Sequence, residues 1–226
     1  MHKKLGCLLI HGFGGSTEEV RPLSEKLTEE GYRVLCPSLK GHTGIRKDLK
    51  TVTYRDWIAS AQSDLEKLKK ECDSICIIGF SMGGLIAVQL ARKYPAAAVV
   101  TLNSPIYYWD VKRVFLNIVD DFKRKSYDNI SRYINSGRKL PLNALIQFRQ
   151  LLSQTKPLLQ EIRCPVFVAQ ALQDDTVRKK SADYIYSHVS SKEKSLQFYE
   201  GSGHLILWSK AAEKVMNDVL YFLYKL

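Results

Sequence analysis

Short runs of apolar residues recur along the chain, and each ends at a glycine, a proline or a polar turn. Runs of about four to eight apolar residues with such ends are typical of strands that are buried on both faces of a parallel sheet. The sequence therefore predicts buried strands at Leu5–Ile10, Tyr32–Cys36, Ser74–Ile78, Ala97–Leu102, Val166–Ala169 and Leu196–Tyr199.

Between these runs, apolar residues return every three or four positions, which is the spacing of a helix with one buried face. The clearest example follows Tyr54, where one face carries Trp57, Ile58, Ala61, Leu65 and Leu68. Weaker patterns predict helices from Ser16 to Gly31, from Leu85 to Tyr94, from Lys179 to Val189, and a last helix that ends at Tyr224.

The first of these helices begins with a recognisable capping signal. Ser16-Thr17-Glu18-Glu19 has the capping-box pattern, in which a serine and a glutamate three positions later satisfy each other's backbone N–H groups. The pattern predicts that Ser16 is the N-cap and that the Glu19 side chain bonds back to the cap.

The alternation of strand and helix predicts an α/β fold, with a mostly parallel central sheet and helices on both faces. Residues 106–160 break this rhythm, because they show helical periodicity in pieces and no clear strand. We expect residues 1–105 and 161–226 to form the core and residues 106–160 to form a small helical cap inserted late in the chain.

A cap above the sheet edge would line a pocket with its large apolar side chains. The alternative for each of these side chains is that it packs the cap onto the core. The candidate lining residues are Ile106, Tyr107, Phe115, Leu145 and Phe148.

The composition is that of an ordinary globular protein: 226 residues, 45% of them hydrophobic and 25% charged. The net charge of +11 suits an anionic partner such as a nucleic acid. However, the basic residues are spread along the chain without a run of five or more, and no DNA- or RNA-binding motif accompanies them. We therefore expect a basic, solvated surface and no nucleic-acid partner.

The five cysteines are irregularly spaced and lie near no histidine cluster, which favours free thiols over disulfides or a metal site. No secretory leader pattern is present, and no apolar run approaches the ~20 residues of a membrane span. The expectation is a cytoplasmic monomer or homodimer without metal, cofactor or stable membrane insertion.

The segment with the strongest chemical signal is Gly79-Phe80-Ser81-Met82-Gly83. It matches G-x-S-x-G, the nucleophile elbow, in which a sharp turn between a strand and a helix exposes a serine hydroxyl. Chance matches to this short pattern are common. Here, however, an apolar strand precedes the segment and a helix follows it, which is the setting that the motif requires. We predict that Ser81 is a nucleophile.

A serine hydroxyl needs a base, and the base needs an acid to orient it. In the order serine, acid, histidine, the histidine follows the last strand, where His204 lies in Gly201-Ser202-Gly203-His204. The acid should follow the strand Val166–Ala169, where Asp174 and Asp175 are both candidates. The residue pattern alone leaves the choice between them open.

Acyl transfer also needs N–H donors for the developing oxyanion. The backbone N–H of Met82, directly after the nucleophile, is one candidate. The second should come from the loop after the first strand, His11-Gly12-Phe13-Gly14-Gly15, where we choose the N–H of Phe13. We expect the His11 side chain to support this loop by a hydrogen bond rather than to carry a proton in the reaction.

Taken together, these motifs resemble those of the compact bacterial carboxylesterases and monoacylglycerol lipases of the α/β-hydrolase family. The resemblance covers nearly the whole chain and is weakest over residues 106–160. It is carried by His11-Gly12-Phe13-Gly14, Gly41-His42, Asp56-Trp57, Phe80-Ser81-Met82-Gly83-Gly84 and Ser202-Gly203-His204.

The resemblance implies a cofactor-free serine carboxylesterase that acts on a small-molecule ester, either a short- to medium-chain ester or a monoacylglycerol. It favours Asp174 as the acid, although Gln173 and Asp175 depart from the family's usual residues and keep that choice open. A thioesterase or lactonase that uses the same triad, and a ligand-binding protein without catalysis, are the alternatives.

Overall fold

The computed structural model describes residues 5–107 and 141–226. All strands of the described chain join one parallel sheet of six strands, in the order β2-β1-β3-β4-β5-β6. The strands are β1 (Leu5–Ile10), β2 (Arg33–Leu35), β3 (Ser74–Phe80), β4 (Ala98–Leu102), β5 (Val166–Ala171) and β6 (Lys194–Tyr199). Each corresponds to a strand expected from the apolar runs, and the α/β fold with a parallel sheet is confirmed.

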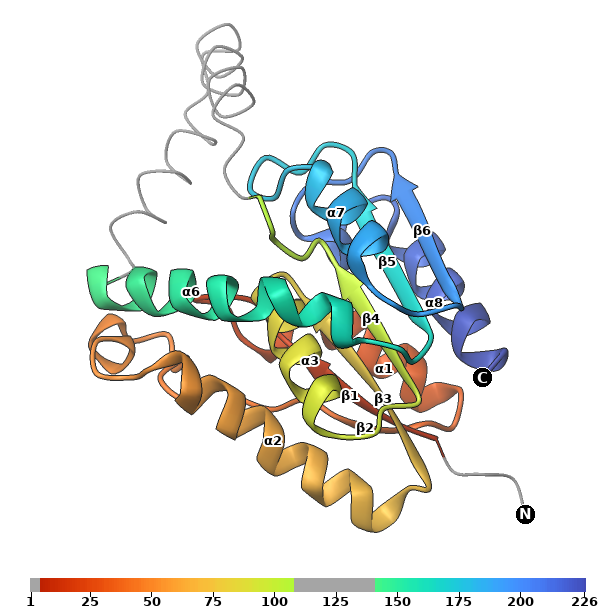
Figure 1. Ribbon diagram of the computed structural model, residues 1–226, viewed down its shortest axis with the longest axis horizontal. Coiled ribbons are helices and arrows are strands. Elements are labelled where there is room, and N and C mark those ends of the chain that lie inside the picture. The colour runs from red at the N-terminus through yellow and green to blue at the C-terminus, as the bar shows by residue number, and fades with distance from the viewer. Residues whose placement is uncertain (1–4, 108–140) are drawn as a thin grey trace, which may run out of the picture.

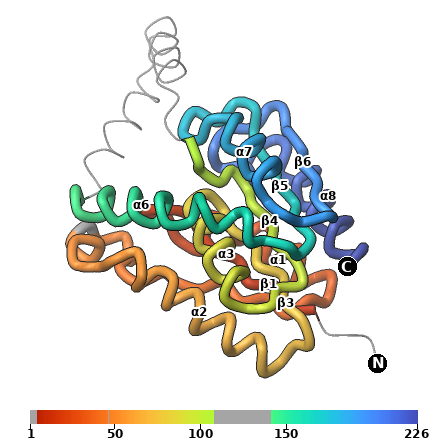
Figure 2. Tube along the Cα trace, in the orientation of Figure 1, coloured from red at the N-terminus to blue at the C-terminus, as the bar shows by residue number. Residues whose placement is uncertain are grey.

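Helices cover both faces of the sheet, as Figures 1 and 2 show. One face carries α2 (Tyr54–Glu71), α3 (Met82–Lys93), α6 (Leu142–Thr155) and α7 (Lys180–His188), and the other carries α1 (Arg21–Glu29) and α8 (Ala212–Tyr224). Short 3-10 helices occur at η1 (Thr17–Glu19), η2 (Arg46–Leu49), η3 (Lys156–Glu161) and η4 (Ile206–Trp208).

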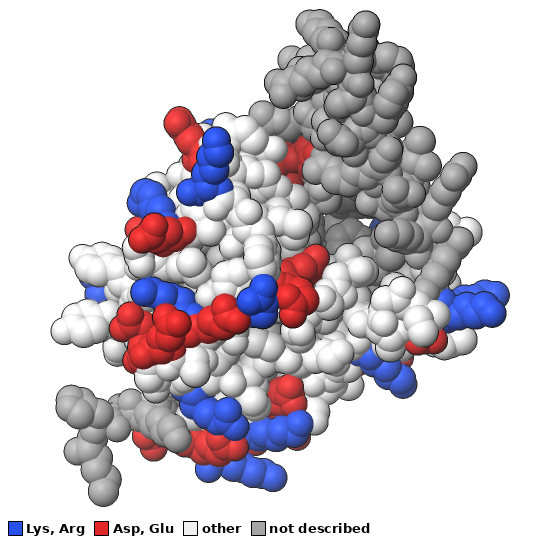
Figure 3. Space-filling view, turned by 180° about the vertical axis from the view of Figure 1, so that it is seen from behind, with Lys and Arg blue, Asp and Glu red and all other residues white. Residues whose placement is uncertain are grey.

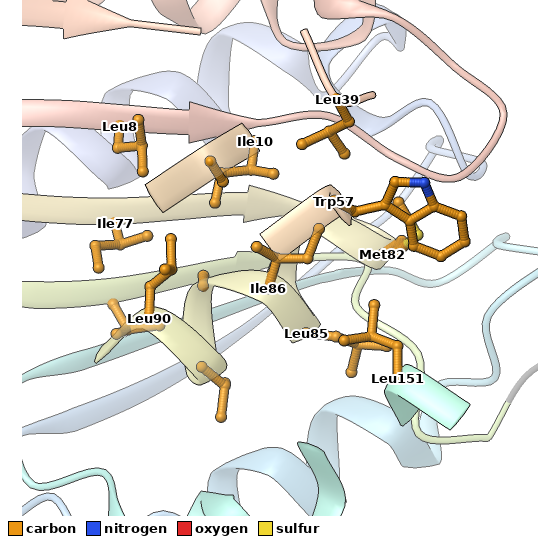
Figure 4. Packing of buried hydrophobic residues seen from close by; sticks show 14 of the residues in the cluster. Leu8, Ile10, Leu39, Trp57, Ile77, Met82, Leu85, Ile86, Leu90 and Leu151 are labelled. Atoms are coloured by element: carbon orange, nitrogen blue, oxygen red, sulfur yellow. The ribbon is translucent and has the colours of Figure 1, made fainter. Parts of the chain in front are cut away.

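The sheet separates two apolar layers because successive strand residues point to opposite faces. In β1, Leu8 and Ile10 belong to the layer under α2 and α3, whereas Cys7 and Leu9 belong to the layer under α1 and α8. Figure 4 shows part of the first layer, where side chains from β1, α3 and α6 fill one continuous space. Both faces of the central strands are buried, as the unbroken apolar runs predicted.

The predicted face of α2 is the buried one, since Trp57, Ala61, Leu65 and Leu68 are all within the core. The helix begins with a complete capping box, in which Thr53 and the Asp56 side chain satisfy each other's backbone N–H groups. The capping box expected between Ser16 and Glu19 is not formed, although Ser16 is an N-cap as predicted. Ser16 caps η1 by accepting from the Glu18 N–H, but the Glu19 side chain bonds elsewhere.

The helix α6 lies across α2 and α3, and its buried side chains belong to the same apolar layer (Figure 1). Of the inserted stretch 106–160, residues 106, 107 and 141–160 are described, and residues 142–161 are helical as expected. No helix in the described parts of the chain has both the length and the apolar character needed to cross a bilayer.

The order of the strands fixes where loops can meet. From β1 the chain first adds β2 on one side and then β3 on the other, so the loops after β1 and β3 leave adjacent strands in opposite directions. Such a switch point at the carboxyl end of a parallel sheet is the usual place for a ligand. The loop His11–Gly15 and the elbow Gly79–Gly84 therefore lie next to each other at this edge of the sheet.

Acidic and basic side chains are intermingled on the face shown in Figure 3, which is seen from behind the view of Figure 1. This face therefore carries both positive and negative charges, which agrees with basic residues that are spread along the sequence rather than clustered.

Candidate active site

Ser81 sits at a sharp turn between β3 and α3. Its φ of 52° and ψ of −121° are sparsely populated for a residue with a side chain. The Ser81 N–H donates to the Leu102 carbonyl at 2.8 Å, which ties the turn to β4. The predicted nucleophile is thus held in a strained conformation of the kind that functional turns retain.

The glycines of the elbow are required by close backbone approach. A Cβ on Gly79 would lie 2.2 Å from the Gly83 carbonyl carbon, and a Cβ on Gly83 would lie 2.1 Å from the Ile10 carbonyl oxygen. Because both obstacles are main-chain atoms, no side chain can be accommodated without moving the strand or the helix. The helix α3 starts at Met82, directly after the serine, and not at Leu85 as the sequence pattern suggested, so Gly83 and Gly84 belong to its first turn.

A continuous chain of hydrogen bonds joins three side chains that are far apart in sequence. The His204 Nε2 atom is 3.1 Å from the Ser81 Oγ, and the His204 Nδ1 atom is 2.8 Å from the Asp174 Oδ2. Since an ionised carboxylate only accepts, Nδ1 carries the proton and Nε2 is left to accept the serine hydroxyl proton. The arrangement is that of a nucleophile, a general base and an orienting acid.

Asp174 is the aspartate whose carboxylate reaches His204. Its side chain is fully buried, and its Oδ1 accepts the N–H groups of Thr176 and Val177 at 2.8 and 2.9 Å. The Asp175 carboxylate instead accepts from the Thr176 hydroxyl at 3.1 Å. Two backbone donors hold Asp174 Oδ1 and so aim Oδ2 at the imidazole.

The charge around His204 favours its protonated form. Burial lowers the pKa of His204, but the neighbouring carboxylate of Asp174, with smaller contributions from Glu19 and Asp175, raises the pKa above its ordinary value of 6.5. The ring also packs against the Phe80 ring, with 5.1 Å between centroids. A base with a raised pKa is a better proton acceptor from a hydroxyl group.

The two predicted oxyanion donors flank the serine. Met82 is the first residue of α3, and an ideal Cβ on Gly12, next to Phe13, would lie 3.2 Å from the Ser81 Cβ. Within residues 5–107 and 141–226, neither the Phe13 N–H nor the Met82 N–H has a hydrogen-bond partner. Both amides remain the predicted oxyanion donors.

His11 supports the loop and is kept neutral. Its Nε2 accepts the Leu39 N–H at 3.3 Å, which leaves Nδ1 to donate to the Gly12 carbonyl at 2.9 Å. Burial lowers the pKa of His11 to about 4, and only the bond to Gly12 opposes that effect. The side chain has the loop-supporting contacts that the sequence analysis expected.

Among the expected pocket residues, Phe148 has a defined place beside the oxyanion loop. Its ring stacks on the Phe13 ring at 5.1 Å with an interplanar angle of 15°. Ile106 is buried in the layer under α2 and α3, the Tyr107 ring meets the Tyr184 ring edge-on at 5.7 Å, and Leu145 is 36% exposed. Phe115 lies outside the described residues.

The sequence analysis assigned no role to Asn103. Its amide donates to the His204 carbonyl at 2.7 Å and to the Gly203 carbonyl at 3.2 Å, and its oxygen accepts the Ala171 N–H at 2.7 Å. Asn103 is fully buried and has a φ of 49°. It fixes the backbone of the histidine loop to the end of β5. A polar residue directly after a buried strand was the available signal.

Gln173 links the acid loop to the histidine loop. Its N–H donates to the Ser202 carbonyl and its side-chain oxygen accepts the Ser202 N–H, both at 3.1 Å. This position is the departure from the family pattern noted above. Here the glutamine closes a two-way bridge between the segments that carry Asp174 and His204.

Comparisons with known proteins agree with this geometry, because the similar proteins are hydrolases. A family model described as "Alpha/beta hydrolase family" matches residues 7–217. A protein of Bacillus subtilis (strain 168) named "Carboxylesterase" is 31% identical over 226 residues, with 97% of this chain and 92% of the relative covered. A "Thermostable monoacylglycerol lipase" of Bacillus sp. (strain H-257) is 31% identical over 210 residues, with 89% and 83% covered.

Solved structures agree on the fold. A chain described under "LipS and LipT, two metagenome-derived lipolytic enzymes" superposes with a TM-score of 0.82 at 24% identity, and the match covers 99% of this chain and 95% of that one. The family match spans most of the chain, and the elbow, sheet order and histidine loop are those that the fold requires. The chain belongs to the alpha/beta hydrolase family.

Proposed function

We propose that this protein is a serine carboxylesterase that hydrolyses short- to medium-chain carboxylic esters, monoacylglycerols among them, through an acyl-enzyme on Ser81. The observation that carries the proposal is the hydrogen-bond chain from Asp174 through His204 to Ser81, with links of 2.8 and 3.1 Å. The names of two relatives of 31% identity, a carboxylesterase and a monoacylglycerol lipase, support an ester as the substrate.

In the first half of the reaction, the Ser81 Oγ attacks the ester carbonyl carbon while His204 Nε2 takes the hydroxyl proton. The Asp174 carboxylate holds the Nδ1–H and stabilises the imidazolium. The raised pKa of His204 favours its uptake of the serine proton. The imidazolium then gives the proton to the leaving alkoxide oxygen, the C–O bond breaks, and the alcohol departs.

The tetrahedral intermediate places negative charge on the former carbonyl oxygen. The Phe13 and Met82 N–H groups, which lack partners among the described residues, are our proposed donors to that oxygen. Met82 adds the favourable end of the α3 dipole. Losing one oxyanion donor of this kind costs on the order of 10²–10³-fold in kcat.

In the second half, water attacks the acyl-enzyme with His204 Nε2 as the general base. The second tetrahedral intermediate uses the same two amides and collapses to release the carboxylic acid, and Ser81 recovers its proton from His204. Each proton and each developing charge is handled by a group of this chain, so we propose that the reaction needs no cofactor.

We further propose that residues 106–160 form a small cap over the core of residues 1–105 and 161–226 and determine the acyl length. The stacked rings of Phe13 and Phe148 give an apolar wall next to the proposed oxyanion donor. The basic, mixed-sign surface suits a free small-molecule ester rather than a nucleic acid, and we propose a monomer or homodimer as the working form.

A series of p-nitrophenyl esters from acetate to palmitate tests the proposal. We expect a maximum of kcat/KM at short or medium chains, and Ser81→Ala to lower kcat by on the order of 10⁴–10⁶-fold. Matched thioester, lactone and amide substrates should react more slowly than the ester. A Ser81→Ala protein with more than a tenth of the wild-type rate would refute the mechanism, and a faster thioester or lactone would refute the substrate class.

A further inference from the structure

The Glu19 side chain reaches the oxyanion loop beside Ser81 instead of capping its own helix. Its Oε2 accepts the Gly12 N–H at 2.8 Å. Gly12 is the residue before Phe13, whose N–H is a proposed oxyanion donor. The bond therefore holds the Gly12 N–H, which directly precedes the proposed oxyanion donor, the Phe13 N–H.

The loop is shaped around this carboxylate. An ideal Cβ on Gly15 would lie 2.2 Å from the Glu19 carboxyl carbon, and one on Gly12 would lie 3.0 Å from its Oε2. The same Gly12 Cβ would be 3.2 Å from the Ser81 Cβ. Two glycines of His11-Gly12-Phe13-Gly14-Gly15 thus leave room for the Glu19 carboxylate, which lies close to the nucleophile.

The charge of Glu19 is costly where it lies. Burial raises the pKa of Glu19, while the Gly12 N–H and the nearby His204 lower it. A glutamine could accept the same Gly12 N–H without the cost of desolvating a charge. The retained carboxylate points to an electrostatic task in addition to the structural one.

The group on which the charge of Glu19 acts is His204. Asp174 binds its Nδ1, and the carboxylates of Glu19 in η1 and Asp175 in the loop after β5 also raise the pKa of His204 through their charge. An anion beside His204 stabilises the imidazolium that forms during the reaction. It also opposes the oxyanion, although the Gly12 N–H that it binds partly neutralises it.

We propose that Glu19 is a positioning residue of this active site, which fixes the oxyanion loop through the Gly12 N–H and, from its place close to Ser81, acts with Asp174 as a second anion that stabilises the His204 imidazolium. The inference rests on the proposed function for its kinetic consequences. Its electrostatic half concerns the resting protein and can be measured without any substrate.

The experiment compares Glu19→Gln, Glu19→Ala and Glu18→Gln. Glu18 is the matched control, since its side chain is 67% exposed, belongs to the same 3-10 helix and pairs with Arg21. Glu19→Gln keeps an acceptor for Gly12 but removes the charge, and Glu19→Ala removes both. The measurements are kcat and KM over a pH range, the NMR titration of the His204 ring, and the melting temperature.

We expect Glu19→Ala to lower kcat by on the order of 10²-fold with KM changed only a few-fold, because a loosened loop misplaces a donor used in the transition state. Glu19→Gln should lose less kcat than Glu19→Ala. It should also move both the acid limb of kcat/KM and the His204 titration midpoint to lower pH. Glu18→Gln should do neither, and melting temperatures should not account for the differences.

The proposal is overturned if Glu19→Ala keeps kcat within about twofold of wild type, or if the His204 midpoint is the same in Glu19→Gln and Glu18→Gln. Should Glu19→Ala fail to fold, the kinetic half rests on Glu19→Gln, whose acid limb must still move. A wild-type protein without ester hydrolysis would refute the proposed function alone, since the NMR titration still decides whether Glu19 acts on His204.

Discussion

The two loops that meet at the nucleophile are held in different ways. In the elbow Gly79–Gly84, main-chain atoms of β1, β3 and α3 approach one another so closely that only glycine fits. In the oxyanion loop His11–Gly15, the backbone is held by side chains: Glu19 binds the Gly12 N–H, and His11 binds the Gly12 carbonyl. One loop is fixed by steric exclusion and the other by polar contacts.

Because the two loops are held differently, substitutions in them should have different effects on folding and on activity. A substitution in the elbow must displace a strand or a helix, so it should damage folding and activity together. A side chain at Gly15 in the oxyanion loop meets only the flexible Glu19 side chain, so it should damage activity while the fold survives.

The largest loss of activity among these variants should follow from changing Asp174, the acid that orients His204 toward Ser81. We expect Asp174→Asn to lower kcat by on the order of 10⁴-fold, because an amide at Oδ2 no longer holds the tautomer with the proton on Nδ1. Asp175→Asn is the matched control and should stay within about tenfold of wild type. Steady-state kinetics on one p-nitrophenyl ester decide the matter, and equal losses in the two variants would contradict the assignment.

A pair of glycine variants tests the contrast itself. Gly83→Ala puts a Cβ 2.1 Å from the Ile10 carbonyl oxygen, whereas Gly15→Ala puts one 2.2 Å from the carboxyl carbon of the movable Glu19 side chain. We expect Gly83→Ala to lower the free energy of unfolding by about 3 kcal/mol or more. Gly15→Ala should stay within about 1 kcal/mol of wild type yet lose about tenfold or more in kcat.

Urea unfolding and kinetics on both glycine variants give the answer. If Gly15→Ala is destabilised as strongly as Gly83→Ala, the oxyanion loop is as rigidly enclosed as the elbow and the contrast fails.

A smaller effect is expected at Asn103, which joins the histidine loop to β5. Asn103→Gly removes its bonds to the His204 carbonyl and the Ala171 N–H, and glycine accepts the φ of 49° without strain. We expect a loss of about 1–3 kcal/mol for the unpaired buried groups and about tenfold in kcat. Asn103→Ala should be less stable by about a further 1 kcal/mol, since it adds left-handed strain. Equal stability of the two variants would argue against strain at this position.

The mildest test is the pH profile of the wild type. His204 must be neutral to act as a base, and its raised pKa places the acid limb of kcat/KM above pH 6.5. His11, whose pKa burial lowers to about 4, stays neutral over this range and adds no second limb. Since the folded-state pKa of His204 is raised, its stabilising contribution is present below its unfolded pKa and is lost as pH rises through the folded value. An acid limb below pH 6.5 would contradict the charge balance described for His204.

Much of the core could be predicted because it depends on local pattern. Every strand of the described sheet corresponds to an apolar run, and the buried face of α2 follows from the spacing of Trp57, Ala61, Leu65 and Leu68. The elbow was recognisable because its glycines are a steric requirement of one short turn. The order after β6 predicted His204, whereas the order after β5 left Asp174 and Asp175 open and the family resemblance favoured Asp174, which the structure joins to His204 by a 2.8 Å bond.

The polar supports of the site could not be predicted in the same way. Asn103 binds groups 68 and 101 residues away, and nothing near it in sequence announces those partners. Glu19 was read as half of a capping box, because that local alternative is available to any Ser-x-x-Glu segment. Its actual partner, the Gly12 N–H, comes within reach only when the loop folds over the end of β1. The roles of Asn103 and Glu19 thus depend on hydrogen bonds that form only in the folded protein.

If Ser81 is an activated nucleophile, it should react with a fluorophosphonate probe, which labels such serines covalently. We predict a mass increase of one adduct on the intact wild-type protein, located on Ser81 by peptide mapping. The adduct should be absent from Ser81→Ala and should form far more slowly on Asp174→Asn. An adduct on another residue, or none on a folded wild-type protein, would contradict the account.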